Sequence, residues 1–202
     1  MTQARRATTP LDEVVLQRGL EAFAELGYDQ TTVRELARRL GVSHNFVNDR
    51  YGSKMAFWRA VVDYASAQAG PETGDADAGL ADDALLAAVV HRFYRAAARN
   101  PLLHRLVVDE SARESPRIEY LHDAYIGPAL AVVAPSVARL VAAGRVPDVP
   151  LHLLYFAVIG PVTGLVQTPL ARRLGRPDGG EPEASADALA ALIVAALVRP
   201  DR

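Results

Sequence analysis

The stretch that decides the fold is TTVRELARRLGVSHNFVNDRYGSK, which runs from Thr31 to Lys54. Its spacing predicts a short amphipathic helix, a glycine turn and a second short helix. Thr32 followed three residues later by Glu35 forms a capping box, which predicts the start of the first helix. Gly41 supplies the left-handed backbone that a tight turn between two helices needs. The stretch therefore predicts a helix-turn-helix.

The second helix of this stretch is expected to display polar side chains. Val42, Val47 and Tyr51 are spaced to hold it against the first helix, which leaves residues 44–46 and 48–50 on its other faces. Hydrogen-bond donors and acceptors on a braced helix are what reading base edges in the major groove requires. The pattern thus indicates binding to double-stranded DNA.

Several side chains near the turn have more than one reading. Phe46 either joins the core or exposes its ring to a thymine methyl group. Arg50 is either a DNA contact or a solvated surface charge, and Asp49 is expected to be solvated because a carboxylate repels phosphate. Arg5 and Arg6 form either a disordered tail or an arm in the minor groove.

Helical spacing continues on both sides of the stretch, and no useful strand alternation appears, so the fold class is all-α. Pro10 fits the first position of a helix that ends at Gly27. Its expected buried face consists of Val15, Gly19, Ala22, Phe23 and Leu26. Ser43 and Ser53 are expected to cap a third and a fourth helix, and the fourth extends to about Ala69.

Gly70 to Gly79 reads as a loop between two domains, at residues 10–69 and 80–199. In the second domain we expect helices near 80–98, 101–115, 117–143, 149–170 and 185–199, with a second loop from Gly175 to Pro182. The third of these is expected to break at Gly127-Pro128 and to kink at Pro135.

Leu11 to about Asp63 resembles the DNA-binding domain of the TetR family of transcriptional regulators, in the order FAELGY, TTVRELA, GVS and YGSK. The resemblance implies an N-terminal three-helix helix-turn-helix domain and a C-terminal helical domain for ligand binding and dimerisation. Gly19 stands where the family usually has Ala, and Asn48 replaces the Tyr that usually contacts phosphate. The DNA-binding residues implied in this way are Thr32, Arg34, Ser43, His44, Asn45, Phe46, Asn48, Arg50, Tyr51 and Lys54.

Two later segments, Leu151 to Val166 and Ala188 to Val198, are apolar nearly all round. A helix that covers one core needs only a single apolar stripe, so the second face is expected to pack against another copy of the chain. The alternative is that both helices are enclosed within one monomer. The expected homodimer contacts are Leu154, Val158, Gly160, Gly164, Leu189, Ile193 and Leu197.

The segment from Leu80 to Val141 is expected to hold a largely apolar small-molecule effector. The candidate lining residues are Phe93, Leu103, Leu106, Val107, Glu110, Tyr120, His122, Tyr125 and Ile126, with His91 and His104 as further polar candidates. The alternative is that these side chains form an ordinary core. Together with the helix-turn-helix, a pocket predicts a repressor that the effector releases from operator DNA.

Composition argues against other classes of protein. The chain has 202 residues, no cysteine and a net charge of −2, which excludes disulfides and thiolate metal sites and argues against indiscriminate coating of nucleic acid. Its five histidines are scattered and it lacks the common catalytic motifs, so we expect no enzyme, no cofactor and no metal. A structural or protein-interaction role is the other alternative.

The ends and apolar runs of the sequence bear on its location. Residues 1–9 are polar and basic, so no signal peptide is expected. The longest apolar stretch, Leu153 to Val166, is too short to span a bilayer. The expectation is a cytoplasmic protein without a membrane partner.

Overall fold

The computed structural model describes residues 10–70, 77, 79–177 and 181–200, and within them every regular element is a helix. The prediction of an all-α fold is confirmed. The first four helices are α1 (Pro10–Leu26), α2 (Val33–Leu40), α3 (Phe46–Tyr51) and α4 (Lys54–Ala69). The later helices are α5 (Asp82–Arg99), α6 (Pro101–Ser111), α7 (Pro116–Leu121), α8 (Gly127–Ala142), α9 (Leu151–Ile159), α10 (Thr163–Val166), α11 (Thr168–Arg173) and α12 (Pro182–Leu197).

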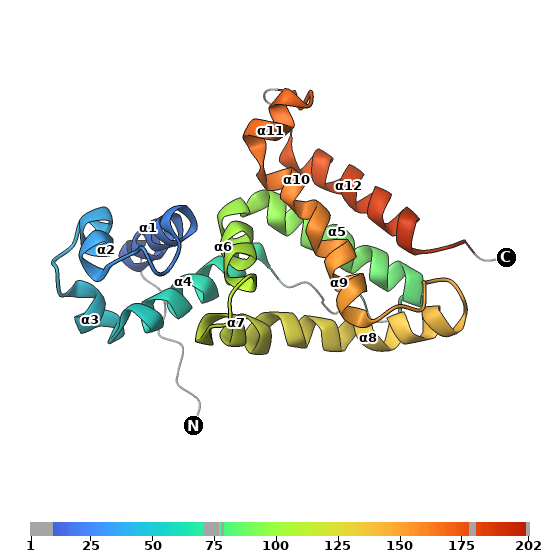
Figure 1. The fold of residues 1–202 in the computed structure, drawn as a ribbon, viewed down its shortest axis with the longest axis horizontal. Helices are drawn as coiled ribbons and strands as arrows, with labels where there is room; N and C mark the ends of the chain where they lie inside the picture. Colours follow the sequence, from blue (N-terminus) through green and yellow to red (C-terminus); the bar gives the residue numbers. More distant parts are fainter. Residues whose placement is uncertain (1–9, 71–76, 78, 178–180, 201–202) are drawn as a thin grey trace.

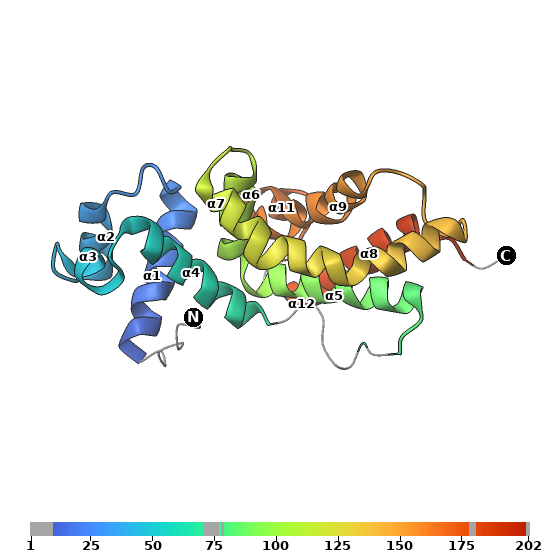
Figure 2. The ribbon, with the colours of Figure 1, turned by 90° about the horizontal axis from the view of Figure 1, so that it is seen from below.

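The molecule is elongated, with its two groups of helices at opposite ends (Figures 1 and 2). Helices α1–α4 form one end, and α2 and α3 are its outermost part. Helices α5, α8, α9 and α12 form the other end, and α6 and α7 lie between the two groups. The N-terminal helices therefore pack directly against α6 and α7.

Two of the three serine and threonine caps predicted from the sequence form in the structure. The cap expected from Ser43 does not form: α3 begins after Asn45, and no side-chain hydrogen bond caps it. The Thr32 side chain accepts a hydrogen bond from the Glu35 backbone N–H at 3.1 Å and so caps α2. Ser53 caps α4 in the same way through the Ala56 N–H, also at 3.1 Å. Gly41 ends α2 with φ +70°, in the left-handed region that favours glycine. These three residues fix the relative direction of α2, α3 and α4.

The larger core is shared between the two ends of the molecule. It contains fully buried aromatic side chains of α1 and α4, among them Phe23, Phe57 and Trp58. Leu106 of α6 and Leu121 of α7 belong to the same cluster, at 3% and 1% exposure. Because burial of each such side chain contributes about 1.5–3 kcal/mol, these contacts join the N-terminal helices firmly to α6 and α7.

A second core holds the other end together. It forms where α5 packs against α12, through residues that include Val90, Tyr94, Ala186 and Ala190. The small side chains of Ala186 and Ala190 lie one helical turn apart, which lets α12 approach α5 closely. The Tyr94 hydroxyl donates a hydrogen bond to the Val158 carbonyl at 2.8 Å and so ties α9 to this core.

The predicted helix at 117–143 differs in detail from the structure. It is helical from Pro116 to Ala142, and the irregularity is a π-helical turn, His122–Ile126, rather than a break at Gly127-Pro128. A Cβ on Gly127 would lie 3.1 Å from the His122 carbonyl oxygen, so a larger residue would crowd this turn. The predicted helix at 149–170 is likewise divided, by a 3-10 turn at Gly160–Val162 and an interruption at Gln167.

The segment Pro116–Ala142 is also long and apolar enough to cross a membrane, by length and composition alone. Charged residues near both ends of this segment interrupt its apolar pattern, so its length as an apolar helix is not evident from the sequence. In the fold, its α8 part packs along α5 and buries Val133, Ser136 and Leu140. Only 11% of its apolar window is buried, so most of this segment lies outside the two cores.

Candidate nucleic-acid interface

Helix α3 lies at the far end of the molecule (Figure 1) and has one buried side and one polar, exposed side. Val47 faces the core and is fully buried, and the Tyr51 ring packs on Phe57 with 4.8 Å between centroids. The exposed residues of α3 and the preceding turn are Ser43, His44, Asn45, Asn48, Asp49 and Arg50. A helix braced on one side and polar on the other fits the major groove of DNA.

Phe46 lies on the core side of this helix. Its ring is half-buried, packs against the larger core and meets the Tyr51 ring edge-on at 6.3 Å between centroids. Of the two readings of the sequence, the structure therefore favours a contribution to the core. The rest of the Phe46 ring is accessible to solvent beside the exposed residues of α3.

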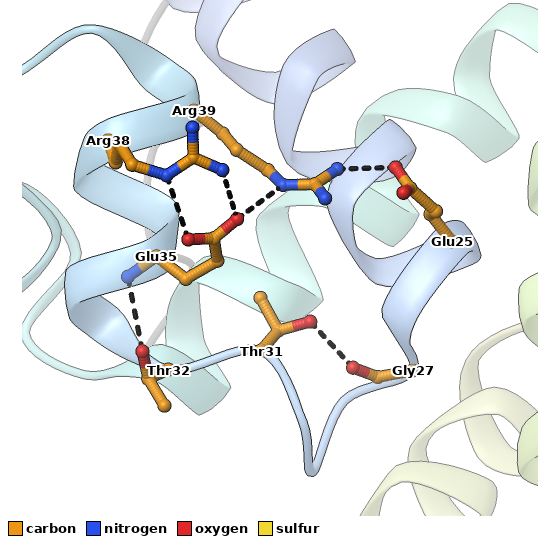
Figure 3. Close-up of polar contacts among 7 residues, drawn as sticks. All are labelled: Glu25, Gly27, Thr31, Thr32, Glu35, Arg38 and Arg39. Carbon is orange, nitrogen blue, oxygen red and sulfur yellow. Dashed lines mark hydrogen bonds and ion pairs between the residues drawn. The ribbon is translucent and has the colours of Figure 1, made fainter.

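A network of ion pairs braces α2 against α1 (Figure 3). Glu35 accepts hydrogen bonds from Arg38 at 2.6 and 2.9 Å and from Arg39 at 2.8 Å. Arg39 also reaches Glu25 of α1. The hydrogen bonds from Arg38 and Arg39 lower the pKa of the Glu35 carboxyl to about 2, so it stays charged at neutral pH. Two arginines close to the helix-turn-helix are therefore held by carboxylates rather than free for phosphate.

Arg50 and Lys54 are also engaged within the protein. An Arg50 guanidinium nitrogen donates to both carboxylate oxygens of Asp12 at 2.9 and 3.0 Å, which fastens α3 to the start of α1. The half-buried Lys54 donates to the Tyr28 carbonyl at 2.9 Å, and burial lowers its pKa. Within the described part of α1–α4, Arg34 is the cationic side chain without such a contact, and it is exposed.

The predicted DNA-binding residues thus fall into two groups. Six of them are exposed around the start of α2 and along α3. They are Thr32, Arg34, Ser43, His44, Asn45 and Asn48. The others are Phe46, Tyr51 and Lys54, which are half-buried, and Arg50, which is exposed and ion-paired. The sequence did not reveal the partners Asp12 and Glu25, because no local pattern connects them to Arg50 and Arg39.

The N-terminal helices meet α6 and α7 through polar contacts as well as the shared core. Arg117 of α7 donates to Glu110 of α6 at 2.8 Å, and their side chains are only 9% and 3% exposed. The Arg117 guanidinium also lies 4.0 Å from the centre of the Tyr28 ring, and the Lys54 ammonium lies at the same distance from that ring. Tyr28 therefore contacts both Arg117 of α7 and Lys54, which the sequence predicts to bind DNA.

A second polar contact joins α4 to the π-helical turn. The carboxylate of Asp63 accepts short hydrogen bonds from the hydroxyls of Tyr120 and Tyr125. Burial raises the pKa of Tyr120 to about 12, so its hydroxyl keeps the proton that it donates. The end of α4 is thus held by two hydroxyl groups of the C-terminal part.

Most of the candidate effector residues belong to the two cores. The larger core takes up Leu103, Leu106, Val107, Tyr120, Tyr125 and Ile126. Phe93 packs in the second core, Glu110 is ion-paired, and His122 is exposed beside Asp123. Two broad hollows, of about 560 and 540 Å³, open on the surface: one between α5 and the end of α12, which the polar candidate His91 helps to line, and the other between α1 and Tyr64.

Helix α9 is scarcely buried, although it is strongly apolar. None of its residues is buried, and Leu153 and Phe156 are 50% and 59% exposed. Leu192 on α12 is 64% exposed. Among the predicted dimer contacts, Leu154 and Leu197 are half-buried and Gly160 and Gly164 are exposed, whereas Val158, Leu189 and Ile193 pack against the second core. A substantial apolar surface therefore faces outward on α9 and α12.

Comparisons with known proteins support these observations. Residues 15–61 match the family model described as "Bacterial regulatory proteins, tetR family". A comparison with curated proteins gives no match. The solved structure of the TetR family transcriptional regulator PfmR from Thermus thermophilus is similar with a TM-score of 0.67 and 22% identity, over 96% of this chain and 100% of that one.

Two further solved structures have the same fold. A TetR family regulator from Marinobacter aquaeolei gives a TM-score of 0.67 at 20% identity, over 93% of this chain and 95% of that one. FadR from Bacillus subtilis, solved in complex with stearoyl-CoA, gives 0.62 at 14% identity, over 91% and 98%. The likeness therefore extends over nearly the whole length of each protein.

Proposed function

We propose that this chain, a member of the TetR family of bacterial regulatory proteins through its residues 15–61, is a homodimeric repressor that a small molecule releases from operator DNA. The observation that carries the proposal is the exposed polar surface of α3, which projects at the end of the molecule on a helix held by the buried Val47. Such a protein acts where the chromosome is, so we infer a cytoplasmic location.

The proposed DNA contacts divide into two roles. We propose that Asn45 and Asn48, on the exposed side of α3, read base edges. Thr32 and Lys54, at the starts of α2 and α4, are proposed to contact the phosphate backbone. A duplex selected from genomic fragments provides the test. Asn45→Ala or Asn48→Ala should cost about 1–3 kcal/mol on the selected duplex and relax sequence choice.

Lys54→Ala should instead weaken selected and random duplexes alike and reduce the salt slope by about 1. Lys54→Arg, which keeps the charge, is the matched control. Equal effects of the asparagine and lysine changes on both kinds of DNA, in gel shifts at several salt concentrations, would refute this division of roles.

Dimerisation is proposed on the outward apolar faces of α9 and α12. A two-fold operator requires two recognition helices about 34–36 Å apart, or a multiple of that distance. Phe156 and Leu192 are large apolar side chains that the monomer leaves mostly exposed. Sedimentation should show a dimer at micromolar concentration, and Phe156→Glu together with Leu192→Glu should give a folded monomer. A wild-type monomer at that concentration would contradict the proposal.

The effector is proposed to be largely apolar. FadR from Bacillus subtilis, which shares the fold, was solved with stearoyl-CoA. An effector that prefers the released state a hundredfold supplies about 2.7 kcal/mol of coupling per site. We therefore expect stearoyl-CoA to weaken DNA binding while CoA alone does not. DNA binding that no acyl compound weakens would favour a constitutive repressor, and a reporter gene behind the operator would separate repression from activation.

A further inference from the structure

We propose that Asp49 is a specificity-determining residue, which accepts a hydrogen bond from the amino group of a cytosine in each half of the operator. The assignment rests on the proposed function, since it requires α3 to enter the major groove. The sequence alone predicts that this carboxylate is only solvated, whereas we assign it a contact to a base.

The position of Asp49 on α3 is the first support. Successive residues of a helix are separated by about 100° of rotation, so a residue two positions after another lies on nearly the opposite side. Val47 is fully buried, and Asp49 is therefore directed away from the core, as Asn45 is on the preceding turn. Helix α3 itself lies at the end of the molecule (Figures 1 and 2), and both Asn45 and Asp49 are exposed.

The local charge is the second support. Among the described residues, the Asp49 side chain has no hydrogen bond or ion pair, and it is exposed. Its neighbour Arg50 does not neutralise it, because that guanidinium is held by Asp12 of α1. The exposed side of α3 consequently presents one uncompensated negative charge near two neutral amides, Asn45 and Asn48.

The chemistry of the groove then restricts what Asp49 can contact. An ionised carboxylate only accepts hydrogen bonds, and it is repelled by phosphate. In the major groove guanine and thymine offer acceptors, adenine offers a donor beside the N7 acceptor, and cytosine offers its N4 amino donor. A carboxylate on the exposed side of a helix that enters the groove is therefore matched by the amino group of cytosine, and it disfavours the acceptor groups of guanine and thymine.

Selection from a random duplex library, with the full-length protein, tests the assignment. The variants are Asp49→Ala and, as a matched loss of one exposed carboxylate of α1, Glu21→Ala. We expect wild type and E21A to select the same half-site with a fixed cytosine, and D49A to lose preference at that position. On the wild-type site, D49A should bind about 5- to 150-fold more weakly, whereas its binding to random DNA should be unchanged or stronger.

Replacement of that C·G pair by T·A separates a base contact from simple repulsion. The replacement should weaken wild type about 5- to 150-fold and D49A hardly at all. If D49A binds selected and random duplexes more tightly by the same factor and selects the same sequence, Asp49 only repels DNA and the assignment is wrong. If wild type selects no sequence, the proposed function itself fails and the assignment fails with it.

Discussion

Replacement of Glu110 by Gln should strongly destabilise the protein. The change keeps the size of the side chain but removes the charge that faces Arg117 at 2.8 Å. Both side chains are more than nine-tenths buried, so the guanidinium would stay in the interior with only the Tyr28 ring and the more distant Asp29 carboxylate, 3.9 Å away, to balance its charge. Loss of one partner of a buried pair costs about 3–5 kcal/mol. For a chain of this length that corresponds to a fall in Tm of about 6–20 °C.

Thermal and urea unfolding measure this effect, with Arg50→Ala as the control. The Arg50–Asp12 pair is more exposed, at 43% and 13% of the side chains, so its loss should cost about 1 kcal/mol or less. The double variant Glu110→Leu, Arg117→Met removes both buried charges and should recover most of the stability. The reasoning is refuted if E110Q is no less stable than R50A, or if the double variant is as unstable as E110Q.

Three further changes test other parts of the structure. His104 is buried with an unpartnered Nε2, and burial lowers its pKa, so the stability that its neutral form contributes is complete above about pH 6.5 and declines as the pH falls below that value. His104→Leu should raise Tm and reduce its loss between pH 7.5 and 5, and an unchanged pH dependence would contradict this. Gly19→Ala would place a Cβ 2.7 Å from the Phe57 ring. The overpacking should cost about 1–3 kcal/mol and outweigh the gain in helix propensity of about 1 kcal/mol, so the urea midpoint should fall. A raised urea midpoint would show that the core rearranges to accept the methyl group. Thr32→Ala removes the cap of α2 and should cost about 1 kcal/mol in urea unfolding, while Thr32→Ser should cost little; equal losses would mean that the hydroxyl does not act as the cap.

The parts of the site that the sequence predicted depend on short-range signals. Thr32, Gly41 and Ser53 act on backbone groups within about four residues, so their types and spacing were sufficient to place the turn and the starts of α2 and α4. The family motifs overlap the same residues. For this reason the helix-turn-helix was predictable, and the match of residues 15–61 to the family model confirms it.

The contacts that the sequence did not predict join residues far apart along the chain. Arg50 and Asp12 are 38 positions apart, and an exposed arginine has several carboxylates within reach of its helix before the tertiary structure selects one. The sequence position of Phe46 is compatible with a ring that points into the core and with one that points outward, because its ring is only half-buried. In an α12 that is apolar all round, periodicity does not distinguish the inward Ile193 from the outward Leu192.

The placement of Leu106 and Leu121 in the larger core limits how this protein can be recombined with its relatives. A chimaera that joins residues 10–70 to a foreign C-terminal domain would lose these two leucines from the core of α1 and α4, together with the Tyr120 ring that lies 6.1 Å from Trp58. A viable graft has to carry α6 and α7 as well, although α5 separates them from α4 along the chain. The unit that evolution or an engineer can exchange is therefore discontinuous in sequence.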